Sequence, residues 1–173
     1  LISNKLLFYL EENNFFYNKQ FGFRKGYSTN HAILSVINFI SKNLKEGKVV
    51  MGILLDIRKC FDMLTHDILL QKLYNYGIRG VPYLWLKSYF NGRKQKVFVN
   101  GMSSDTLCDI LLGVLQGSIL GVILFLIFIN DLNNSCPELF NCIFADDNTS
   151  LLAEVDLNIL ISRANIELDN LTK

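Results

Sequence analysis

Residues 110–129, which lie within the longest uncharged stretch of the sequence, most strongly limit what this chain can fold into. This segment has 20 residues and only two polar side chains, Gln116 and Ser118, so it is long enough for a membrane-spanning helix. However, three glycines surround the polar pair in its first half, which is typical of a loop. The uninterrupted apolar part, 119–129, is too short to cross a bilayer. We therefore expect a glycine-rich loop followed by a buried core helix, with a membrane anchor as the less favoured alternative.

The composition is that of a folded protein of one domain. The 173 residues are 50% hydrophobic and 19% charged, which gives enough apolar surface for a core and too little charge for disorder. The cysteines at 60, 108, 136 and 142 have no CxxC spacing, so neither a zinc site nor a redox pair is indicated. We expect free thiols in an intracellular protein of the nucleus or the cytoplasm.

Charge is distributed unevenly along the chain, although the net charge is only +1. Residues 1–104 contain 15 lysines and arginines against 6 acids, whereas residues 105–173 contain 2 against 10. This division indicates contact with a polyanion by one part of the chain and an acid-requiring site, such as a metal centre, in the other. A solvated basic face is the simpler alternative.

Apolar periodicity and turn residues predict alternating helices and strands. We expect a helix at about 6–10, a basic loop over 17–27 and a second helix capped near Ser28. The inward positions of the second helix are expected to be Ile33, Val36, Ile37, Ile40 and Leu44. The apolar run 49–55, which ends in Asp56, is typical of a central strand buried on both faces.

The remaining segments complete an α+β arrangement. Helices are predicted at about 68–76 and 82–90, and a hairpin over 94–110 turns at Asn100-Gly101. Two strands, 140–145 and 149–153, are joined by a turn at 146–148, and Asp156 caps a last helix. The inward positions of this last helix are predicted to be Leu157, Leu160, Ile161, Ala164 and Leu168. The order indicates a small antiparallel sheet packed by helices, mostly on one side.

Three carboxylates lie at ends of the predicted strands. Asp56 ends the apolar strand, and Asp146 and Asp147 lie in the hairpin turn. Burying such charges is unfavourable unless a cation balances them, and Mg²⁺ prefers oxygen ligands. If the hairpin packs beside the apolar strand, Asp56 and Asp146 hold two ions of the kind that drive in-line attack at phosphorus, and Asp147 adds charge. A solvated turn is the simpler alternative for the aspartate pair.

Seven short motifs follow one another along the chain. They are Gln20-Phe21-Gly22-Phe23-Arg24 with Ser28-Thr29, Leu55-Asp56 through Lys59-Cys60-Phe61-Asp62, Tyr76-Gly77-Ile78, Asn91-Gly92-Arg93-Lys94-Gln95, Gly113-Val114-Leu115-Gln116-Gly117-Ser118, Ile129-Asn130-Asp131-Leu132 and Phe144-Ala145-Asp146-Asp147. In this order they resemble the fingers and palm of reverse transcriptases of the non-LTR retrotransposon type, similar to the jockey-like elements.

The resemblance implies a catalytic site with two Mg²⁺ ions, for which Mn²⁺ can substitute. Asp56 and Asp146 would be metal ligands together with the backbone carbonyl of Ile57. Asp147 would be the third catalytic acid.

The resemblance also implies contacts with an RNA template, a DNA primer and a dNTP. Phe61 would lie under the sugar of the nucleotide, where its ring excludes a 2′-hydroxyl, although a core aromatic is the simpler alternative. Gln116 and Gly117 would contact nucleotide and template, and Arg24 the triphosphate. The residues expected to hold template-primer phosphates are Arg93, Lys94 and Lys96.

Some positions depart from the family pattern. Leu115 stands where the family usually has proline, which frees φ there and restores an N–H, so the loop carrying Gln116 is expected to be less fixed. Asn148 stands where threonine or serine is usual after the acidic pair. Three further departures are Cys60, Leu112 and Val122. None removes a carboxylate.

We therefore predict a reverse transcriptase domain fragment over residues 1–173, with the right-hand palm, partial fingers and the thumb absent. About 1–50 and 63–110 would be finger and palm helices with the basic hairpin, and 48–62 with 111–173 the palm core. The predicted function is RNA-directed DNA polymerisation, in which a primer 3′-hydroxyl receives a nucleotide from a dNTP. A catalytically inert nucleic-acid-binding remnant of such an element is the alternative, and no membrane partner is expected.

Overall fold

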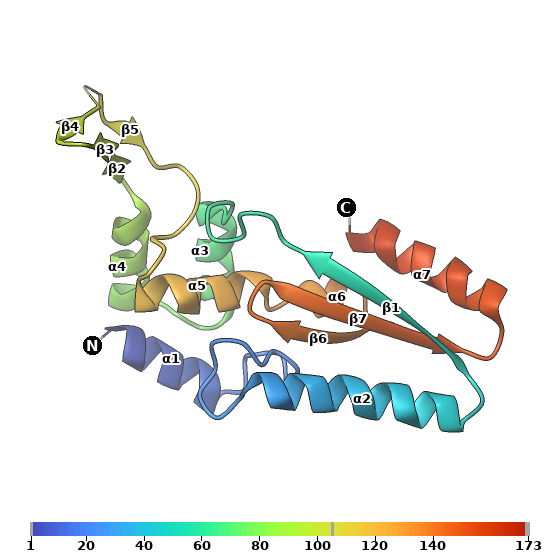
Figure 1. Ribbon diagram of the computed structural model, residues 1–173. Coiled ribbons are helices and arrows are strands. Elements are labelled where there is room, and N and C mark those ends of the chain that lie inside the picture. Colours follow the sequence, from blue (N-terminus) through green and yellow to red (C-terminus); the bar gives the residue numbers. More distant parts are fainter. Residues whose placement is uncertain (1, 105, 172–173) are drawn as a thin grey trace. The chain divides into compact units, whose positions relative to one another are not determined.

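The computed structural model describes residues 2–104 and 106–171. The chain forms two compact units, one made of Leu1–Phe15 with Lys59–Phe128 and the other of Phe16–Arg58 with Ile129–Lys173. The first is called the helical unit below, and the second is called the sheet unit. Helices and a small antiparallel sheet confirm the predicted α+β class (Figure 1).

The sheet unit is built on three antiparallel strands. They are β1 (Val49–Asp56), β6 (Phe140–Phe144) and β7 (Asp147–Glu154). The spatial order is β1-β7-β6, so β7 is the central strand. Its register aligns Val49 with Glu154 at one end of β1 and Asp56 with Asp147 at the other.

The prediction that β1 is a central strand buried on both faces is wrong. Within the described sheet β1 pairs only with β7, and the side chain of Leu54 is 81% exposed. The strand buried on both faces is β7, where the neighbouring residues Leu151 and Leu152 are each only 3% exposed. An apolar run alone does not distinguish an edge from a centre, because pairing order is set by tertiary contacts.

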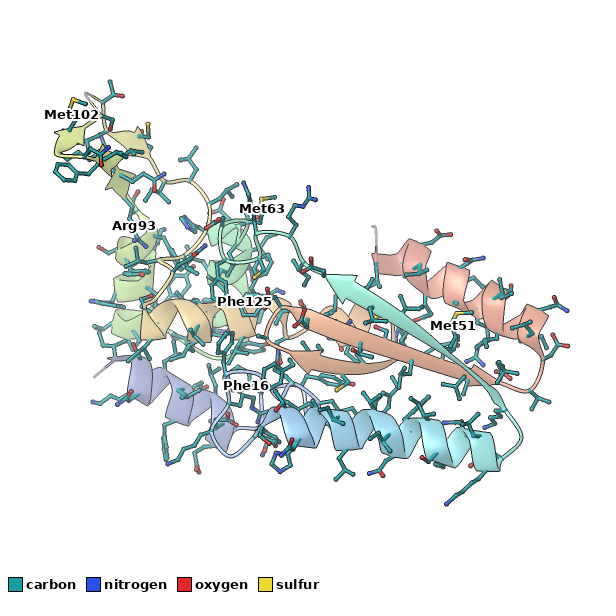
Figure 2. The ribbon with its side chains drawn as sticks, viewed as in Figure 1. Phe16, Met51, Met63, Arg93, Met102 and Phe125 are labelled. Atoms are coloured by element: carbon teal, nitrogen blue, oxygen red, sulfur yellow. The ribbon has the colours of Figure 1, made fainter. Side chains whose placement is uncertain are left out.

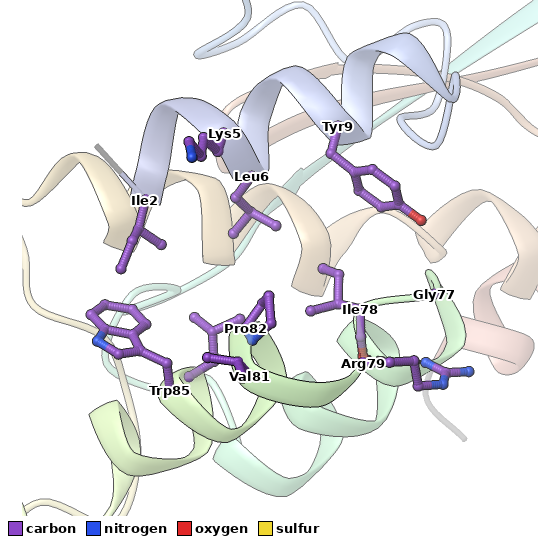
Figure 3. A pocket seen from close by; sticks show the side chains of 11 residues that line it. Ile2, Lys5, Leu6, Tyr9, Gly77, Ile78, Arg79, Val81, Pro82 and Trp85 are labelled. Atoms are coloured by element: carbon purple, nitrogen blue, oxygen red, sulfur yellow. Dashed lines mark hydrogen bonds between the residues drawn. The ribbon is translucent and has the colours of Figure 1, made fainter.

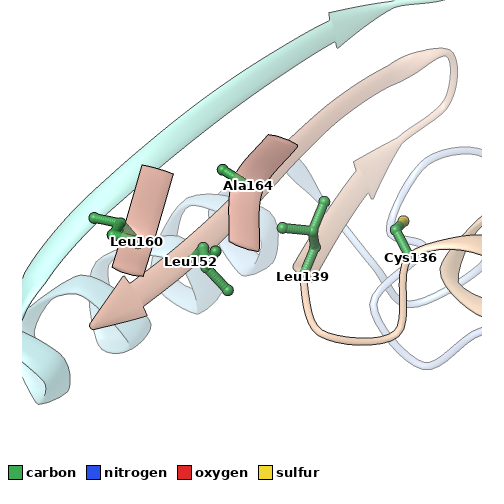
Figure 4. Packing of buried hydrophobic residues seen from close by; sticks show 5 residues of the cluster. All are labelled: Cys136, Leu139, Leu152, Leu160 and Ala164. Carbon is green, nitrogen blue, oxygen red and sulfur yellow. The ribbon is translucent and has the colours of Figure 1, made fainter. Parts of the chain in front are cut away.

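Helices cover both faces of this sheet rather than mostly one. Helix α2 (Thr29–Lys45) packs against one face, where Ala32, Phe21 and Cys142 form a buried cluster. Helix α7 (Leu157–Leu171) packs against the other face (Figure 1). There Leu160 and Ala164 join β7 and the segment after the short helix α6 (Leu132–Ser135) in a second buried cluster, whose members are Cys136, Leu139, Leu152, Leu160 and Ala164 (Figure 4).

The apolar faces of both helices are only partly the predicted ones. In α2 the inward positions include Ala32 and Val36, whereas Ile33, Ile37 and Leu44 are exposed. In α7, Leu160 and Ala164 are buried as predicted, whereas Leu157 and Ile161 are exposed. Both helices contain more apolar residues than one buried face requires, so apolar periodicity alone does not identify which of them are buried.

The connection between β6 and β7 is tighter than predicted. Phe144 pairs with Asp147, so the turn contains only Ala145 and Asp146. Asp147 and Asn148 therefore belong to β7, and Asn148 is buried rather than part of a loop. Asp156 caps α7 as predicted, since its Oδ1 accepts from the backbone N–H of Asn158 at 2.7 Å and of Ile159 at 3.1 Å.

The helical unit contains the other helices and two short strand pairs. They are α1 (Ile2–Glu12), α3 (His66–Asn75), α4 (Gly80–Phe90), α5 (Ile119–Ile129), β2 (Lys94–Gln95) paired with β5 (Cys108–Asp109), and β3 (Phe98–Val99) paired with β4 (Met102–Ser103). The hairpin turns at Asn100 (φ 50°) and Gly101 (φ 82°), as predicted. Phe125 of α5 and Met102 of the hairpin are marked in Figure 2.

Helix α5 confirms that the longest uncharged stretch contains a buried helix. Phe125 and Ile127 are at most 1% exposed. Across residues 2–104 and 106–171, every helix is too short or too polar to cross a lipid bilayer. All four cysteines are free thiols.

An apolar groove lies between α1 and α4 of the helical unit. Its volume is about 480 Å³, and Leu6, Pro82 and Trp85 contribute to its wall (Figure 3). None of the predicted site residues lines it.

Candidate active site

Three aspartates lie at one end of the sheet. Asp56 ends β1 and is the direct partner of Asp147, which begins β7. Side chains of directly opposed residues in an antiparallel pair project to the same side, with Cβ atoms about 4.5–5.5 Å apart. Asp146 is the preceding residue in the two-residue turn. The register thus brings the backbone positions of the three predicted catalytic residues together, and Ile57 directly follows Asp56.

The donor set at this sheet end suits a hard divalent cation. Within the described residues, the carboxylates of Asp56, Asp146 and Asp147 make no hydrogen bond or ion pair to protein, so their oxygens are not already used. No group of three or more His, Cys, Asp or Glu side chains close enough to hold a metal ion occurs in 2–104 and 106–171. Mg²⁺ does not require such a group, because it is commonly bound by one or two carboxylates plus substrate phosphates.

The turn that carries Asp146 is locally strained. Ala145 has φ 57°, in the left-handed region that favours glycine and costs other residues about 1 kcal/mol or more. The residue is nevertheless buried, at 7% exposure. Such a conformation persists only where surrounding contacts enforce it.

Those contacts come from the loop over residues 17–27. The N–H of Phe21 donates to the carbonyl of Ile143 at 2.8 Å, and the N–H of Ile143 donates to Lys19 at 2.9 Å. The loop therefore continues the sheet beyond β6. A Cβ added to Gly22 would lie 2.0 Å from the backbone nitrogen of Ala145, so this glycine directly abuts the turn.

Arg24 has a structural position within this loop. Its Nη1 donates to the carbonyls of Tyr17 at 3.1 Å and Gln20 at 3.4 Å. Its guanidinium also lies 4.7 Å from the ring centre of Tyr27 and 5.2 Å from that of Phe16. These contacts show that Arg24 helps to hold the loop in its folded form. A contact with a triphosphate would have to use the same guanidinium group.

A buried polar network lies behind the aspartate end of the sheet. The hydroxyl of Ser150 donates to Oδ1 of Asn141 at 2.6 Å, and Nδ2 of Asn148 donates to Ser150 at 3.0 Å and to Asn141 at 3.3 Å. The Oδ1 of Asn148 is buried and has no hydrogen-bond partner among the residues that the structure describes. A network of this kind fixes the relative positions of β6 and β7.

In the helical unit, the segment after Lys59 is tied to the glycine-rich loop. The N–H of Val114 donates to the carbonyl of Phe61 at 2.9 Å, and the N–H of Gly113 donates to Leu64 at 2.8 Å. The side chain of Gln116 donates from Nε2 to Oδ1 of Asp62 at 2.9 Å. Two predicted nucleotide contacts, Phe61 and Gln116, are thus held in one assembly despite being far apart in sequence.

Phe61 is half-buried and stacks on Phe125 with ring centres 4.7 Å apart. Gly117 has φ 81° and is exposed, so a side chain there would be strained. Backbone bonds from Val114 and Ser118 anchor the loop on either side of Leu115, whose carbonyl also accepts from the Ser118 hydroxyl at 2.8 Å.

The three predicted phosphate contacts differ in their surroundings. Arg93 is half-buried, with its guanidinium 4.8 Å from the ring centre of Tyr89 (Figure 2). Its Nη1 is buried and has no hydrogen-bond partner within residues 2–104 and 106–171. Lys94 lies 3.7 Å from Asp109 in an exposed pair. Lys96 is exposed, and no ion pair to it occurs within the described residues.

In each unit, one residue that contacts a predicted site segment was not assigned a role from the sequence. Asp62 and Gly22 both belong to the quoted motifs, but their functions depend on contacts with Gln116 and Ala145. Their positions next to Phe61 and Phe21 were the only available signals.

A known protein family and several known proteins resemble this chain over most of its length. The family model described as reverse transcriptase (RNA-dependent DNA polymerase) matches residues 1–157. The chain is 32% identical over 155 residues to a probable RNA-directed DNA polymerase from transposon BS of Drosophila melanogaster, covering 88% of this chain and 16% of that protein. It is 32% identical over 161 residues to the RNA-directed DNA polymerase from mobile element jockey of the same species, covering 87% and 17%. For the jockey protein of Drosophila funebris the identity is 34% over 134 residues, covering 78% and 14%. The chain thus spans about a sixth of the length of these curated relatives.

Proposed function

The chain belongs to the reverse transcriptase (RNA-dependent DNA polymerase) family, and we propose that it is the part of a retrotransposon RNA-directed DNA polymerase that carries the catalytic aspartates. The proposed reaction is attack of a primer 3′-hydroxyl on the α-phosphate of a dNTP, with release of pyrophosphate. The proposed partners are an RNA template and a DNA primer.

The observation that carries this proposal is the register at the end of the sheet. Asp56 and Asp147 are direct partners and Asp146 occupies the adjoining turn, which supports a site built on these three acids. Most of what a phosphoryl-transfer enzyme supplies is positioning and charge stabilisation. Three acids on a rigid sheet end meet both needs.

We assign roles to individual residues on this basis. Asp56, Asp146 and the carbonyl of Ile57 hold the metal, and Asp147 adds charge. Mg²⁺, when bound, supplies activation of a hydroxyl and neutralisation of phosphate charge. Phe61 excludes a 2′-hydroxyl from the nucleotide sugar, and Gln116 and Gly117 contact the nucleotide and the template.

The division into right-hand subdomains belongs to the same proposal. We assign residues 48–62 and 111–173 to the palm core and residues 1–50 and 63–110 to finger and palm helices with the basic hairpin. Arg93, Lys94 and Lys96 would bind template-primer phosphates, in a contact that is independent of sequence and weakened by salt.

The test is metal-dependent nucleotide binding without turnover. A template-primer ending in a dideoxynucleotide blocks chemistry, and the amount of ternary complex is measured against dNTP concentration with and without Mg²⁺. We expect Mg²⁺-dependent binding of the dNTP that matches the template, lost in Asp56→Asn and Asp146→Asn. Direct titration with Mn²⁺, followed by electron paramagnetic resonance, should show the same loss.

The same assay separates the polymerase from an inert nucleic-acid-binding remnant. The remnant would bind template-primer with normal salt dependence but would not retain the matched dNTP at any Mg²⁺ concentration. That result, from a folded wild-type chain, would reject the polymerase proposal.

A further inference from the structure

Asp62 holds the side chain of Gln116 within the helical unit. The distance from Gln116 Nε2 to Asp62 Oδ1 is 2.9 Å, and both residues are exposed. The two lie 54 positions apart, so this bond joins two motifs that only the fold brings together.

The chemistry of the pair determines which end of the amide faces Asp62. An ionised carboxylate only accepts hydrogen bonds, whereas a glutamine amide has one donating and one accepting end. Gln116 must therefore present Nε2 to Asp62, and its Oε1 is directed to other partners. Without Asp62 the amide is free to rotate, and the two ends exchange.

The backbone around the pair is held independently. A Cβ on Gly113 would lie 2.9 Å from both Cα and the carbonyl oxygen of Asp62, so the two segments are in close backbone contact. His66 adds a bond from Nε2 to the carbonyl of Gly113 at 2.7 Å. Loss of the Asp62 carboxylate should thus release the Gln116 side chain without releasing the loop.

We propose that Asp62 is a positioning residue that fixes the Gln116 amide so that its Oε1 acceptor is presented to the bound deoxynucleotide. This inference rests on the proposed polymerase function, since it concerns the same nucleotide site. It assigns no catalytic chemistry to Asp62, which acts only through Gln116.

The orientation is tested first in the chain alone. In ¹⁵N-labelled protein, exchange of the Gln116 side-chain amide protons with water should be slowed by the bond to Asp62. We expect Asp62→Ala to accelerate this exchange about tenfold. Asp62→Asn, which keeps an oxygen at the same place, should stay close to wild type. Asp67→Ala removes the same charge from the same unit and serves as the control. Unchanged Gln116 exchange in a folded Asp62→Ala chain would overturn the inference.

The consequence for nucleotide binding is measured with the dideoxy-terminated ternary complex. Asp62→Ala should raise the Kd for the matched dNTP about 3- to 10-fold, the usual range for one hydrogen bond. Gln116→Ala should raise it as much, and the double variant should add nothing further. Asp62→Asn should recover most of the affinity.

The outcomes separate this inference from the function on which it rests. If Gln116→Ala weakens dNTP binding while Asp62→Ala does not, the polymerase proposal stands and the role of Asp62 is rejected. If the wild-type chain retains no matched dNTP, the polymerase proposal fails and the nucleotide role of Asp62 fails with it.

Discussion

Replacing Gly22 with alanine should displace the turn that carries Asp146. The added Cβ would lie 2.0 Å from the backbone nitrogen of Ala145 and 2.8 Å from its Cα. Because real contacts of this kind are not shorter than about 3 Å, one backbone must move by roughly 1 Å. The neighbours are backbone atoms, so no flexible side chain can absorb the change.

Two effects of different size follow. Overpacking commonly costs about 1–3 kcal/mol, and we expect Gly22→Ala to lie at the upper end. Displacement of a catalytic group by about 1 Å can cost roughly 10²-fold in rate. A shift of that size would also move the carboxylate of Asp146 away from the other ligands, so we expect a large loss of Mn²⁺ affinity at the aspartates. Urea denaturation measures the first effect, and Mn²⁺ titration of the folded protein measures the second.

Gly52 provides a matched control for Gly22. It lies in β1 of the same unit, and its added Cβ would meet only a side-chain atom of Leu151 at 3.5 Å, an ordinary contact. Gly52→Ala should therefore be neutral or stabilise the chain by up to about 1 kcal/mol, since it restricts the unfolded state. If both variants behave alike, or if Gly22→Ala keeps wild-type stability and Mn²⁺ affinity, the steric argument is wrong.

Further predictions concern the two units separately. Burial raises the pKa of Tyr17 from 10.0 to about 12. Because the native state favours the neutral phenol, the free energy of unfolding should fall as pH rises from about 10 to about 12. Tyr17→Phe should make this fall smaller, as measured by urea denaturation at alkaline pH. Asn141→Ala should cost about 2–3 kcal/mol in urea denaturation because it leaves buried partners unpaired. Asn148→Ala should cost only about 1 kcal/mol, since it also removes a buried oxygen without a hydrogen-bond partner in the described part of the chain; equal costs would contradict the network. Lys96→Ala should reduce the log-salt slope of template-primer binding by up to about 0.9, and Lys94→Ala by less because an acid already pairs with it; an unchanged slope for both would indicate a solvated basic face.

The sequence was sufficient for features that depend on local chemistry. The turn at Asn100-Gly101 needs two residues that tolerate a positive φ, and both residues adopt a positive φ in the structure. The end of α3 before Gly77, at φ 84°, has the same origin. The apolar stretch of α5 also needed no tertiary information, since its charge-free composition leaves burial as the favourable outcome.

Features that depend on partner choice could not be predicted in the same way. The apolar run 49–55 predicts a strand buried on both faces. In the described sheet, however, β1 pairs only with β7 and lies at the edge, and Leu54 is 81% exposed. In α2, Ile33 and Val36 are both apolar, so the sequence does not distinguish them. Only Val36 packs against the buried cluster beside the sheet, whereas Ile33 is exposed. In the site, Asp62 acquires its partner only when the loop carrying Gln116 folds against it.

The turn next to the aspartates is constrained by a loop that lies far from it in sequence. Ala145 adopts φ 57° in the turn next to Asp146, a conformation that costs a non-glycine residue about 1 kcal/mol or more. Glycine at 145 would remove that cost but would let the turn sample other conformations. Gly22 instead closes against Ala145 from the side, and the backbone bonds between Phe21 and Ile143 hold this contact in place. The strain is thus maintained by the loop over 17–27, and the geometry of the acids depends on a segment that contains none of them.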